Sequence, residues 1–306
     1  MSVVSLGGVL WWVAHQPPPR LPVDGAGLVF VVLALLAYAG ITAGRALRWN
    51  SILSGSGLGG YRRTLELLII GYMGNTVLPL RGGEVLRVLL LAREAGKSHA
   101  RVIGTIVPER VLDAAALTTV FVSLTAAGTA GSPAGAAPAE FGAALVLLAA
   151  AALFVYMRLR AGGHFARFAA RARPLTAASR PLLSRRGAAL FVLSVAIWSA
   201  EALVFFLVAH SLKLEIALLE SLYLVVLASF VSLIPAGPGF AGTFDGAVLF
   251  ALNALGVGGS AALGCVVLYR LVIFAPITFA GLVLLVRRHG GLRTLRSARA
   301  PASEPL

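Results

Sequence analysis

The chain has 306 residues, of which 58% are hydrophobic and 12% are charged, and its mean hydropathy is +0.90. A soluble domain of this length carries about 25% charged residues, so the composition excludes an ordinary soluble protein and indicates a polytopic membrane protein. The net charge of +14 resembles that of a nucleic-acid-binding protein, but the arginines gather between apolar runs, and membrane topology explains them without a nucleic-acid partner.

The apolar runs, taken in chain order, predict six membrane-spanning helices. The N-terminal run "SVVSLGGVLWWVAH" lacks a basic segment before it, and we interpret it as a short first span that ends in a tryptophan anchor, not as a signal peptide. Five later runs approach or exceed the roughly 20 residues that a spanning helix needs. These runs are Gly27–Trp49, Gly104–Leu124, Glu140–Met157, Gly187–Ala209 and Ala261–Val286.

Two further apolar segments are interrupted by proline and glycine. Thr64–Leu91 contains "GNTVLPLRGGEVLR", and Glu220–Leu255 contains "SLIPAGPGFAGTFDG". Each has two apolar halves that are too short to span comfortably, so we predict two re-entrant helical hairpins. The expected fold is all-α, with six spanning helices and these two hairpins in one membrane domain (residues 1–290), followed by a disordered cytoplasmic tail (residues 291–306).

The arginines predict the orientation, because cytoplasmic loops are enriched in Lys and Arg. Residues 158–186 hold eight arginines and no acidic residue, and five more follow Val286. We therefore expect a basic cytoplasmic loop at 158–186, both termini in the cytoplasm, and a multi-pass protein of the cell (inner) membrane.

An internal repeat accompanies this topology. A shift of 156 residues aligns the two broken segments, and beyond the break the shift is about 160. By the arginine topology, repeat one (about 27–127) and repeat two (about 187–287) run in opposite directions, as in transporters with discontinuous helices. The aligned residues are Arg45 with Glu201, Pro79 with Pro235, Glu84 with Asp245, and Arg110 with Arg270.

Eight charged residues fall in or beside membrane segments, where each costs roughly 2.5–3.5 kcal/mol. They are Glu84, Arg87, Glu109, Arg110, Asp113, Glu201, Asp245 and Arg270. A polar cavity explains the set, whereas structural pairs such as Arg110 with Asp113 or Arg270 with Asp245 are the alternative for single residues. For Arg81 a further explanation is that its long side chain extends to the lipid headgroups on the cytoplasmic side.

The arginines suit an anionic guest, because guanidinium binds phosphate bidentately. Helix N-termini after the two breaks add oriented N–H groups, and Asn75 and Thr243 offer neutral hydrogen bonds. The acidic residues either hold the arginines or bind a proton or cation. "GPGFAG" lacks the βαβ context of a dinucleotide site and the histidines are scattered, so we expect no cofactor and no metal.

The motifs resemble those of the lysylphosphatidylglycerol synthase transmembrane region, or flippase-like domain family. "GNTVLPLRGGEVLR" resembles its N-x-x-x-P-x-x-x-G-E-x-x-R signature, "IVPERVLD" its E-R-x-x-D helix, and "SLIPAGPGFAGTFDG" its second broken segment, in which Asp245 stands where the family has Glu. The resemblance and the charge pattern together give a set of expected substrate-binding residues. They are Asn75, Pro79, Arg81, Gly83, Glu84, Arg87, Glu109, Arg110, Asp113, Pro235, Gly237, Gly239, Gly242, Thr243, Asp245 and Arg270.

The resemblance implies a translocase that moves an anionic, aminoacylated or polyprenyl-linked lipid between leaflets. In multiple peptide resistance factors a soluble synthase domain follows this region, and we expect none here because the sequence ends at Leu306. The main alternative is a scaffold for a lipid-modifying enzyme or glycosyltransferase partner. A membrane enzyme using Glu84 and Glu109 is less favoured because no nucleophile or metal set accompanies them, and the oligomeric state is not indicated.

Overall fold

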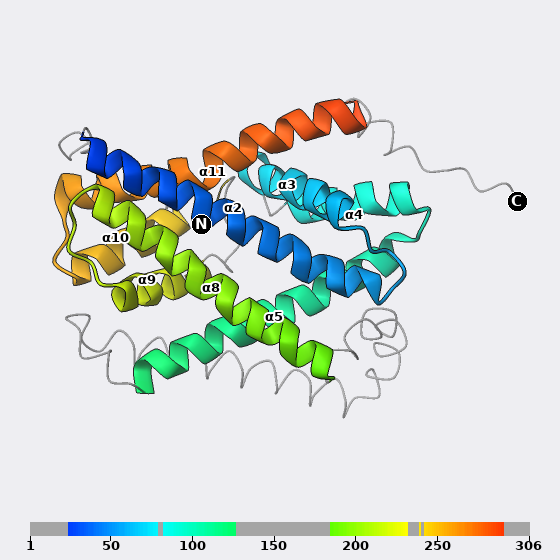
Figure 1. Ribbon diagram of the computed structural model, residues 1–306, viewed down its shortest axis with the longest axis horizontal. Coiled ribbons are helices and arrows are strands. Elements are labelled where there is room, and N and C mark those ends of the chain that lie inside the picture. Colours follow the sequence, from blue (N-terminus) through cyan, green and yellow to red (C-terminus); the bar gives the residue numbers. More distant parts are fainter. Residues whose placement is uncertain (1–23, 79–81, 127–183, 232–238, 240–241, 291–306) are drawn as a thin grey trace, which may run out of the picture.

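The computed structural model describes residues 24–78, 82–126, 184–231, 239 and 242–290, and the regular structure in these ranges is entirely helical (Figure 1). A long helix, two short helices and a second long helix follow one another, and the same order then recurs. The first set is α2 (Gly25–Ser54), α3 (Tyr61–Val77), α4 (Gly82–Ala95) and α5 (His99–Ala126). The second set is α8 (Arg185–Ser211), α9 (Leu218–Val231), α10 (Thr243–Ala254) and α11 (Gly259–His289).

Among the helices that the structure describes, three are long and apolar enough to cross a membrane, namely α2, α8 and α11, with 30, 27 and 31 residues. They coincide with three of the predicted spans and, with the other helices of the described ranges, support a helical membrane protein. Helix α5 has 28 residues but carries Glu109, Arg110 and Asp113 near its middle, and it is not among these three. The predicted spans before Asp24 and at Glu140–Met157 lie outside the described residues, so the number of six spans stays a prediction.

Capping side chains set where two of the long helices begin. The Asp24 carboxylate accepts the N–H of Gly27 at 2.8 Å, and the Ser184 hydroxyl accepts the N–H of Gly187 at 3.4 Å. Such side chains satisfy backbone donors that have no partner in the first turn of a helix. Both caps lie three residues before the start of a predicted apolar run, Gly27 or Gly187, so these helices begin close to where the sequence pattern indicates.

Helix α2 joins the two largest apolar cores of the described residues. Ala34 and Ile41 of α2 pack with α8, α9, α10 and α11, whereas Ala46, Trp49 and Leu53 of the same helix pack with α3, α4 and α5. Helices α2 and α8 pack against each other, and α11 packs along α3 (Figure 1). The polar site described below lies between these cores.

The first broken segment folds into a tight helical pair, α3 and α4. The Asn75 side-chain oxygen accepts the N–H of Gly83 at 3.0 Å, which ties the start of α4 to α3. A Cβ atom on Gly83 would overlap the carbonyl oxygen of Gly71 and lie 2.6 Å from the Asn75 nitrogen. Glycine at position 83 is therefore required by backbone contact between the two helices, not by its own dihedral angles.

Gly83→Ala is expected to destabilise the protein by about 1–3 kcal/mol, the usual cost of overpacking, or by more. The methyl group has to push α4 away from α3, because the atoms that it meets are backbone atoms. The thermal unfolding midpoint in detergent measures the effect. Gly40→Ala is the matched control, since a Cβ there meets nothing within 4 Å, and a midpoint for Gly83→Ala equal to that of the control would contradict the contact.

Candidate functional site

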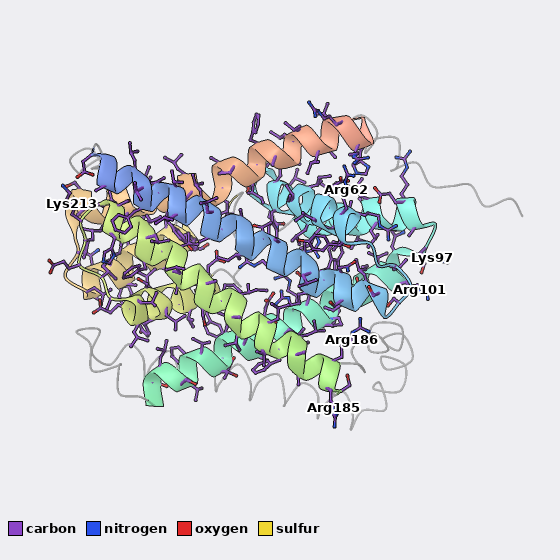
Figure 2. All side chains as sticks on the ribbon, viewed as in Figure 1. Arg62, Lys97, Arg101, Arg185, Arg186 and Lys213 are labelled. Carbon is purple, nitrogen blue, oxygen red and sulfur yellow. The ribbon has the colours of Figure 1, made fainter. Side chains whose placement is uncertain are left out.

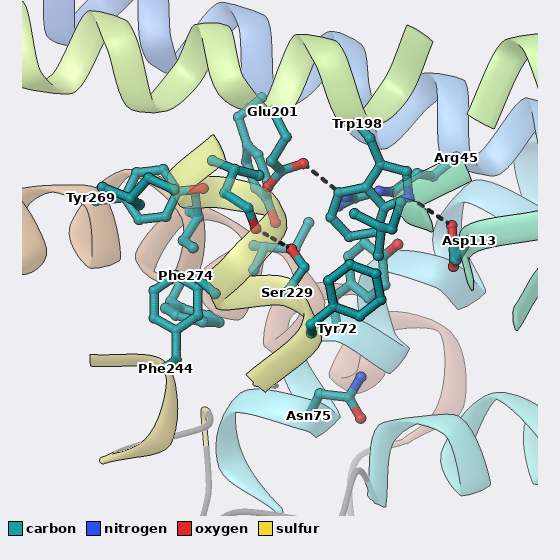
Figure 3. Close-up of a pocket in the computed structure, with 18 of the residues that line it drawn as sticks. Arg45, Tyr72, Asn75, Asp113, Trp198, Glu201, Ser229, Phe244, Tyr269 and Phe274 are labelled. Carbon is teal, nitrogen blue, oxygen red and sulfur yellow. Dashed lines mark hydrogen bonds and ion pairs between the residues drawn. The ribbon is translucent and has the colours of Figure 1, made fainter. Parts of the chain in front are cut away.

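A cavity of about 430 Å³ lies among the helices, and all eight described helices contribute to its wall (Figure 3). This volume is at the lower end of the roughly 300–1,000 Å³ that small-molecule sites occupy. Leu224, Val225, Phe230, Ile273 and Ile277 form part of an apolar side. The opposite side carries ion pairs and rings with polar atoms, so the cavity is amphipathic.

The first ion pair joins α2 to α8. Arg45 Nη2 lies 2.7 Å from Glu201 Oε2, and the two side chains are only 12% and 9% exposed. The Arg45 guanidinium lies between the rings of Tyr72 and Trp198, 5.8 Å and 5.3 Å from their centroids. Cation–π contacts of this kind are worth about 0.5–2 kcal/mol. Arg45 is therefore held by Glu201, Tyr72 and Trp198 together.

The second cluster joins α4 to α5 and is more open. Arg110 Nη2 lies 2.9 Å from Glu84 Oε1, and Arg110 Nη1 lies 3.4 Å from Asp113 Oδ2. The Arg110 side chain is 38% exposed and that of Glu84 is 24% exposed. Both face the cavity, together with the amide of Asn75. Among the cavity-lining charges, Arg110 is thus the cation that a guest can reach most easily.

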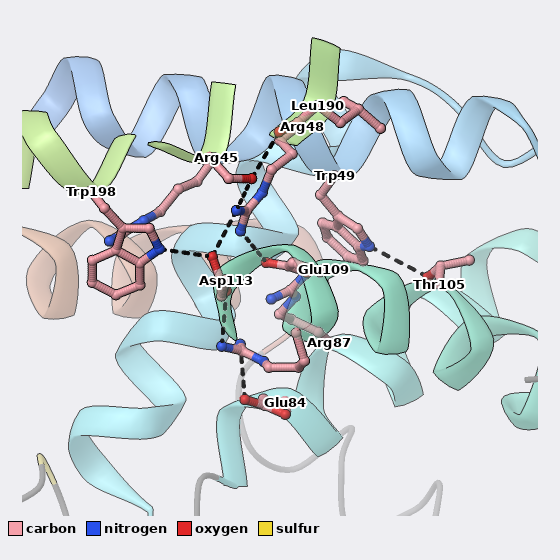
Figure 4. Close-up of polar contacts among 12 residues, drawn as sticks. Arg45, Arg48, Trp49, Glu84, Arg87, Thr105, Glu109, Asp113, Leu190 and Trp198 are labelled. Atoms are coloured by element: carbon pink, nitrogen blue, oxygen red, sulfur yellow. Dashed lines mark hydrogen bonds and ion pairs between the residues drawn. The ribbon is translucent and has the colours of Figure 1, made fainter. Parts of the chain in front are cut away.

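Asp113 connects this cluster to the helices behind it (Figure 4). Its Oδ1 atom accepts hydrogen bonds from Arg48 Nη1 at 2.7 Å and from Trp198 Nε1 at 3.2 Å. Arg48 also donates to the Ser194 hydroxyl at 2.8 Å. Asp113 therefore keeps Arg48 of α2 as a charged partner even when Arg110 moves away from it.

A fully buried layer lies behind the cavity wall (Figure 4). Arg87 Nη2 lies 2.8 Å from Glu109 Oε2, and Arg48 Nη2 lies 3.7 Å from Glu109 Oε1, with all three side chains 1% exposed. The Arg87 guanidinium stacks 3.8 Å from the centroid of the Trp49 ring, and Trp49 donates to Thr105 at 3.4 Å. This layer supports the wall and does not line the cavity.

The second broken segment forms a separate cluster. Arg270 donates from Nε and Nη2 to both carboxylate oxygens of Asp245, and from Nη1 to the Gly239 carbonyl at 3.1 Å. The Gly242 N–H donates to Asp245 at 3.0 Å. Gly239 and Gly242 have φ angles of 62° and 87°, a region that favours glycine. Thr243 is the first residue of α10.

The structure thus divides the predicted site residues into groups. Asn75, Glu84, Arg110 and Asp113 line the cavity, Arg87 and Glu109 lie behind it, and Gly83 packs the α3–α4 hairpin. Gly239, Gly242, Asp245 and Arg270 form the second cluster, which Thr243 adjoins along the chain. The two pairs that the sequence offered as the structural alternative, Arg110 with Asp113 and Arg270 with Asp245, are both present. Pro79, Arg81, Pro235 and Gly237 lie outside the described residues.

Sequence reasoning did not place several of the lining side chains at the site. They are Tyr38, Arg45, Tyr72, Trp198 and Tyr269. For three of them their position was a usable signal, because Tyr and Trp of membrane helices are enriched at the two interfaces, whereas Tyr38, Trp198 and Tyr269 lie well inside the long apolar helices α2, α8 and α11. Arg48 and Trp49 were also not among the predicted site residues, although Arg48 donates to Asp113 and the Trp49 ring stacks on Arg87.

Comparisons with known proteins agree with the sequence motifs. The family model described as lysylphosphatidylglycerol synthase TM region matches residues 2–281. A similar protein is UPF0104 membrane protein PH1989 of Pyrococcus horikoshii, which is 28% identical over 109 residues. The matched segment covers 34% of this chain and 32% of that relative, about a third of its length. No solved structure matches the chain.

Proposed function

Since the chain belongs to the lysylphosphatidylglycerol synthase transmembrane-region family, we propose that it moves a membrane lipid between leaflets, with the lipid headgroup in the cavity between the helices. The observation that carries this proposal is the cavity of about 430 Å³ with ion pairs in its wall, built by all eight described helices. It is too small to hold a headgroup together with two acyl chains, so the chains stay in the bilayer while the headgroup crosses.

The polar wall lowers the barrier that makes unaided lipid exchange slow. A charged group at the bilayer centre costs several kcal/mol, from about 2.5 upward. Arg110, Glu84 and Asn75 offer charged and hydrogen-bonding partners in place of water. The apolar side of the cavity leaves a path for the start of the acyl chains.

The inverted repeat is part of this proposal, and three contacts support it. Arg45 and Glu201 are aligned by the 156-residue shift and contact each other, as residues near a two-fold axis between α2 and α8 would. Glu84 pairs with Arg110, and the aligned Asp245 pairs with Arg270. Two halves of opposite orientation around one central site are the usual construction for alternating access. Helices α3–α4 and α9–α10 are then the two re-entrant hairpins.

The orientation in the membrane is also proposed. Arg62, Lys97, Arg101, Arg185 and Arg186 lie toward one end of the molecule and Lys213 lies at the other (Figure 2). By the positive-inside rule, the arginine-rich end faces the cytoplasm. With six spans, both termini lie in the cytoplasm, and the protein belongs to the inner membrane.

Cysteine labelling in intact cells tests this orientation. Lys213→Cys is expected to react with a membrane-impermeant maleimide from outside, because its side chain is 79% exposed. Lys97→Cys, also exposed, is expected to react only after permeabilisation. Both variants also carry Cys265→Ala, which removes the single native cysteine of the chain. The reverse labelling pattern would overturn the orientation.

A scaffold that holds a lipid-modifying enzyme or glycosyltransferase is the second candidate. Its support is that Arg45 and Arg110, the two arginines in the described part of the cavity wall, are each paired with a carboxylate, as helix-holding charges would be. A scaffold does not need to move lipid, so the rate of lipid movement between leaflets distinguishes the two functions.

Reconstitution separates them. The purified chain in vesicles is given headgroup-labelled anionic, zwitterionic, aminoacylated and polyprenyl lipids, and loss of label from the outer leaflet is followed against protein-free vesicles. We expect at least one class to cross faster with the protein present. If none crosses faster, with and without a proton gradient, the translocase proposal fails and the scaffold is favoured.

A further inference from the structure

Three tyrosines in the cavity wall carry hydroxyl groups that have no partner among the described residues. Tyr38 of α2, Tyr72 of α3 and Tyr269 of α11 line the cavity, and Figure 3 shows the last two. Their hydroxyls make no hydrogen bond with the described part of the chain. A buried tyrosine hydroxyl usually has a partner, and Tyr269 is only 3% exposed. These hydroxyls therefore indicate a guest that brings hydrogen-bonding groups of its own.

Asn75 adds a neutral donor to this part of the wall. Its side-chain oxygen accepts the N–H of Gly83 at 3.0 Å, and its side-chain nitrogen donates to no described residue. Asn75 follows Tyr72 by three residues in α3, so the two side chains share one face of the helix, and both line the cavity. The amide and the hydroxyls together offer hydrogen bonds without adding charge.

The aromatic rings of the wall suit an uncharged guest. The Arg45 guanidinium lies 5.8 Å and 5.3 Å from the ring centroids of Tyr72 and Trp198, and that of Arg270 lies 5.7 Å from the centroid of Phe244. A second cation at these rings would lie close to one of the two arginines and would be repelled. An ammonium group on the headgroup therefore gains little from these rings.

A ring of hydroxyl-bearing carbon atoms matches both features of the wall. Its C–H groups can pack on aromatic rings, and its hydroxyls can donate and accept, as those of tyrosine do. A headgroup without hydroxyls would displace water from Tyr269 and leave nothing in its place, which lowers affinity. Sites built to hydrogen-bond a substrate hydroxyl reject analogues that lack it.

We propose that the headgroup is a ring polyol, a sugar or a cyclitol, joined to the lipid through a phosphodiester. The phosphate binds Arg110, and the ring hydroxyls bind the three tyrosine hydroxyls and the Asn75 amide. This inference rests on the proposed lipid translocation. It adds the chemical class of the headgroup and the side chains that select it.

The test compares phospholipids of equal charge, labelled on one acyl chain, in phosphatidylcholine vesicles that contain the purified full chain. Phosphatidylmethanol has no headgroup hydroxyl, phosphatidylglycerol has hydroxyls on an open chain, and phosphatidylinositol and phosphatidylglucose have them on a ring. We expect both ring lipids to cross at least about tenfold faster than phosphatidylmethanol, since they add several hydrogen bonds of about threefold to tenfold each. The faster of the two shows whether a cyclitol or a sugar fits better.

Tyr269→Phe tests the assignment of the hydroxyls. It removes one hydroxyl and keeps the ring, which stacks on Phe244. The preference for phosphatidylinositol over phosphatidylmethanol is expected to fall about threefold to tenfold, the effect of one hydrogen bond, and to fall likewise in Tyr38→Phe and Tyr72→Phe. Tyr223→Phe is the matched control, because this tyrosine of α9 is not among the residues that line the cavity. Its preference is expected to equal that of the native protein.

The outcomes separate this inference from the function on which it rests. If phosphatidylmethanol crosses as fast as the ring lipids, the polyol proposal is wrong and translocation stands. If phosphatidylglycerol crosses as fast as they do, the site does not select a ring. A Tyr269→Phe protein that keeps the native preference removes its hydroxyl from the headgroup site.

If the native chain moves none of these lipids and none of the wider panel, the failure is that of the proposed function. Binding then decides on the headgroup. The same lipids are offered to the purified protein in detergent, and the bound lipid is measured by native mass spectrometry. A preference for the ring lipids that Tyr269→Phe reduces supports the polyol site, and equal binding of all the lipids overturns it.

Discussion

Glu109→Ala is expected to cost the protein about 3–5 kcal/mol of folding stability, the usual effect of breaking a buried ion pair. The variant leaves Arg87, which is 1% exposed, without the carboxylate at 2.8 Å, and it also removes a charge near Arg48. The Nε and Nη1 atoms of Arg87 already have no hydrogen-bond partner within the described part of the chain. Thermal unfolding and monodispersity in detergent measure the loss.

A charge-free replacement of the pair provides the sharper test. Arg87→Met with Glu109→Leu removes both charges while keeping apolar volume, and such exchanges are often neutral or stabilising. We expect the double variant to be more stable than Glu109→Ala. Glu66→Ala, in which a surface pair is lost, is expected to cost less than about 1 kcal/mol. A Glu109→Ala variant as stable as Glu66→Ala would contradict the structural role of the buried layer.

The features that the sequence predicted best are those where polarity interrupts an apolar chain. The broken segment around Asn75 and Gly83 is a helical pair as expected, and Arg110 lies next to Asp113 as one alternative proposed. Charges inside a membrane need partners, so a short list of charges leaves few ways to pair them. The family was likewise identified from these interruptions and is confirmed by the match over residues 2–281.

The sequence did not predict in the same way which side of each long helix faces the cavity and which faces the lipid. In a soluble protein, polar residues mark the outer face of a helix, but lipid and protein core are both apolar, so the apolar part of α2 does not show which side faces the cavity. Tyr38 was therefore missed as a cavity residue. Arg45 was aligned with Glu201 in the sequence but was not counted among the site residues, although it is a charge in the same helix. Asn75 was predicted as a substrate-binding residue, but its side-chain oxygen accepts the N–H of Gly83. The residue type alone does not distinguish such a local contact from a contact with a headgroup.

Arg110→Ala is expected to reduce lipid movement by about a hundredfold or more, because a phosphate held by two charged hydrogen bonds loses about 1.5–3 kcal/mol for each and 1.4 kcal/mol is tenfold. Its effect on stability is expected to be much smaller than that of Glu109→Ala, since the Arg110 side chain is 38% exposed and Asp113 retains Arg48. The measurements are the transport rate in vesicles and the unfolding midpoint of the same preparation.

Arg110→Lys and Arg288→Ala complete the set. Lysine keeps the charge but not the planar fork that binds phosphate bidentately, so it is expected to restore part of the rate. Arg288 is 50% exposed and pairs with Glu66 away from the cavity, and its loss should leave transport unchanged. A protein that unfolds in Arg110→Ala as it does in Glu109→Ala would make Arg110 a structural charge. A folded Arg110→Ala protein that moves lipid at the native rate would exclude it from the headgroup path, because the accessible guanidinium is what distinguishes this cluster from the buried layer behind it.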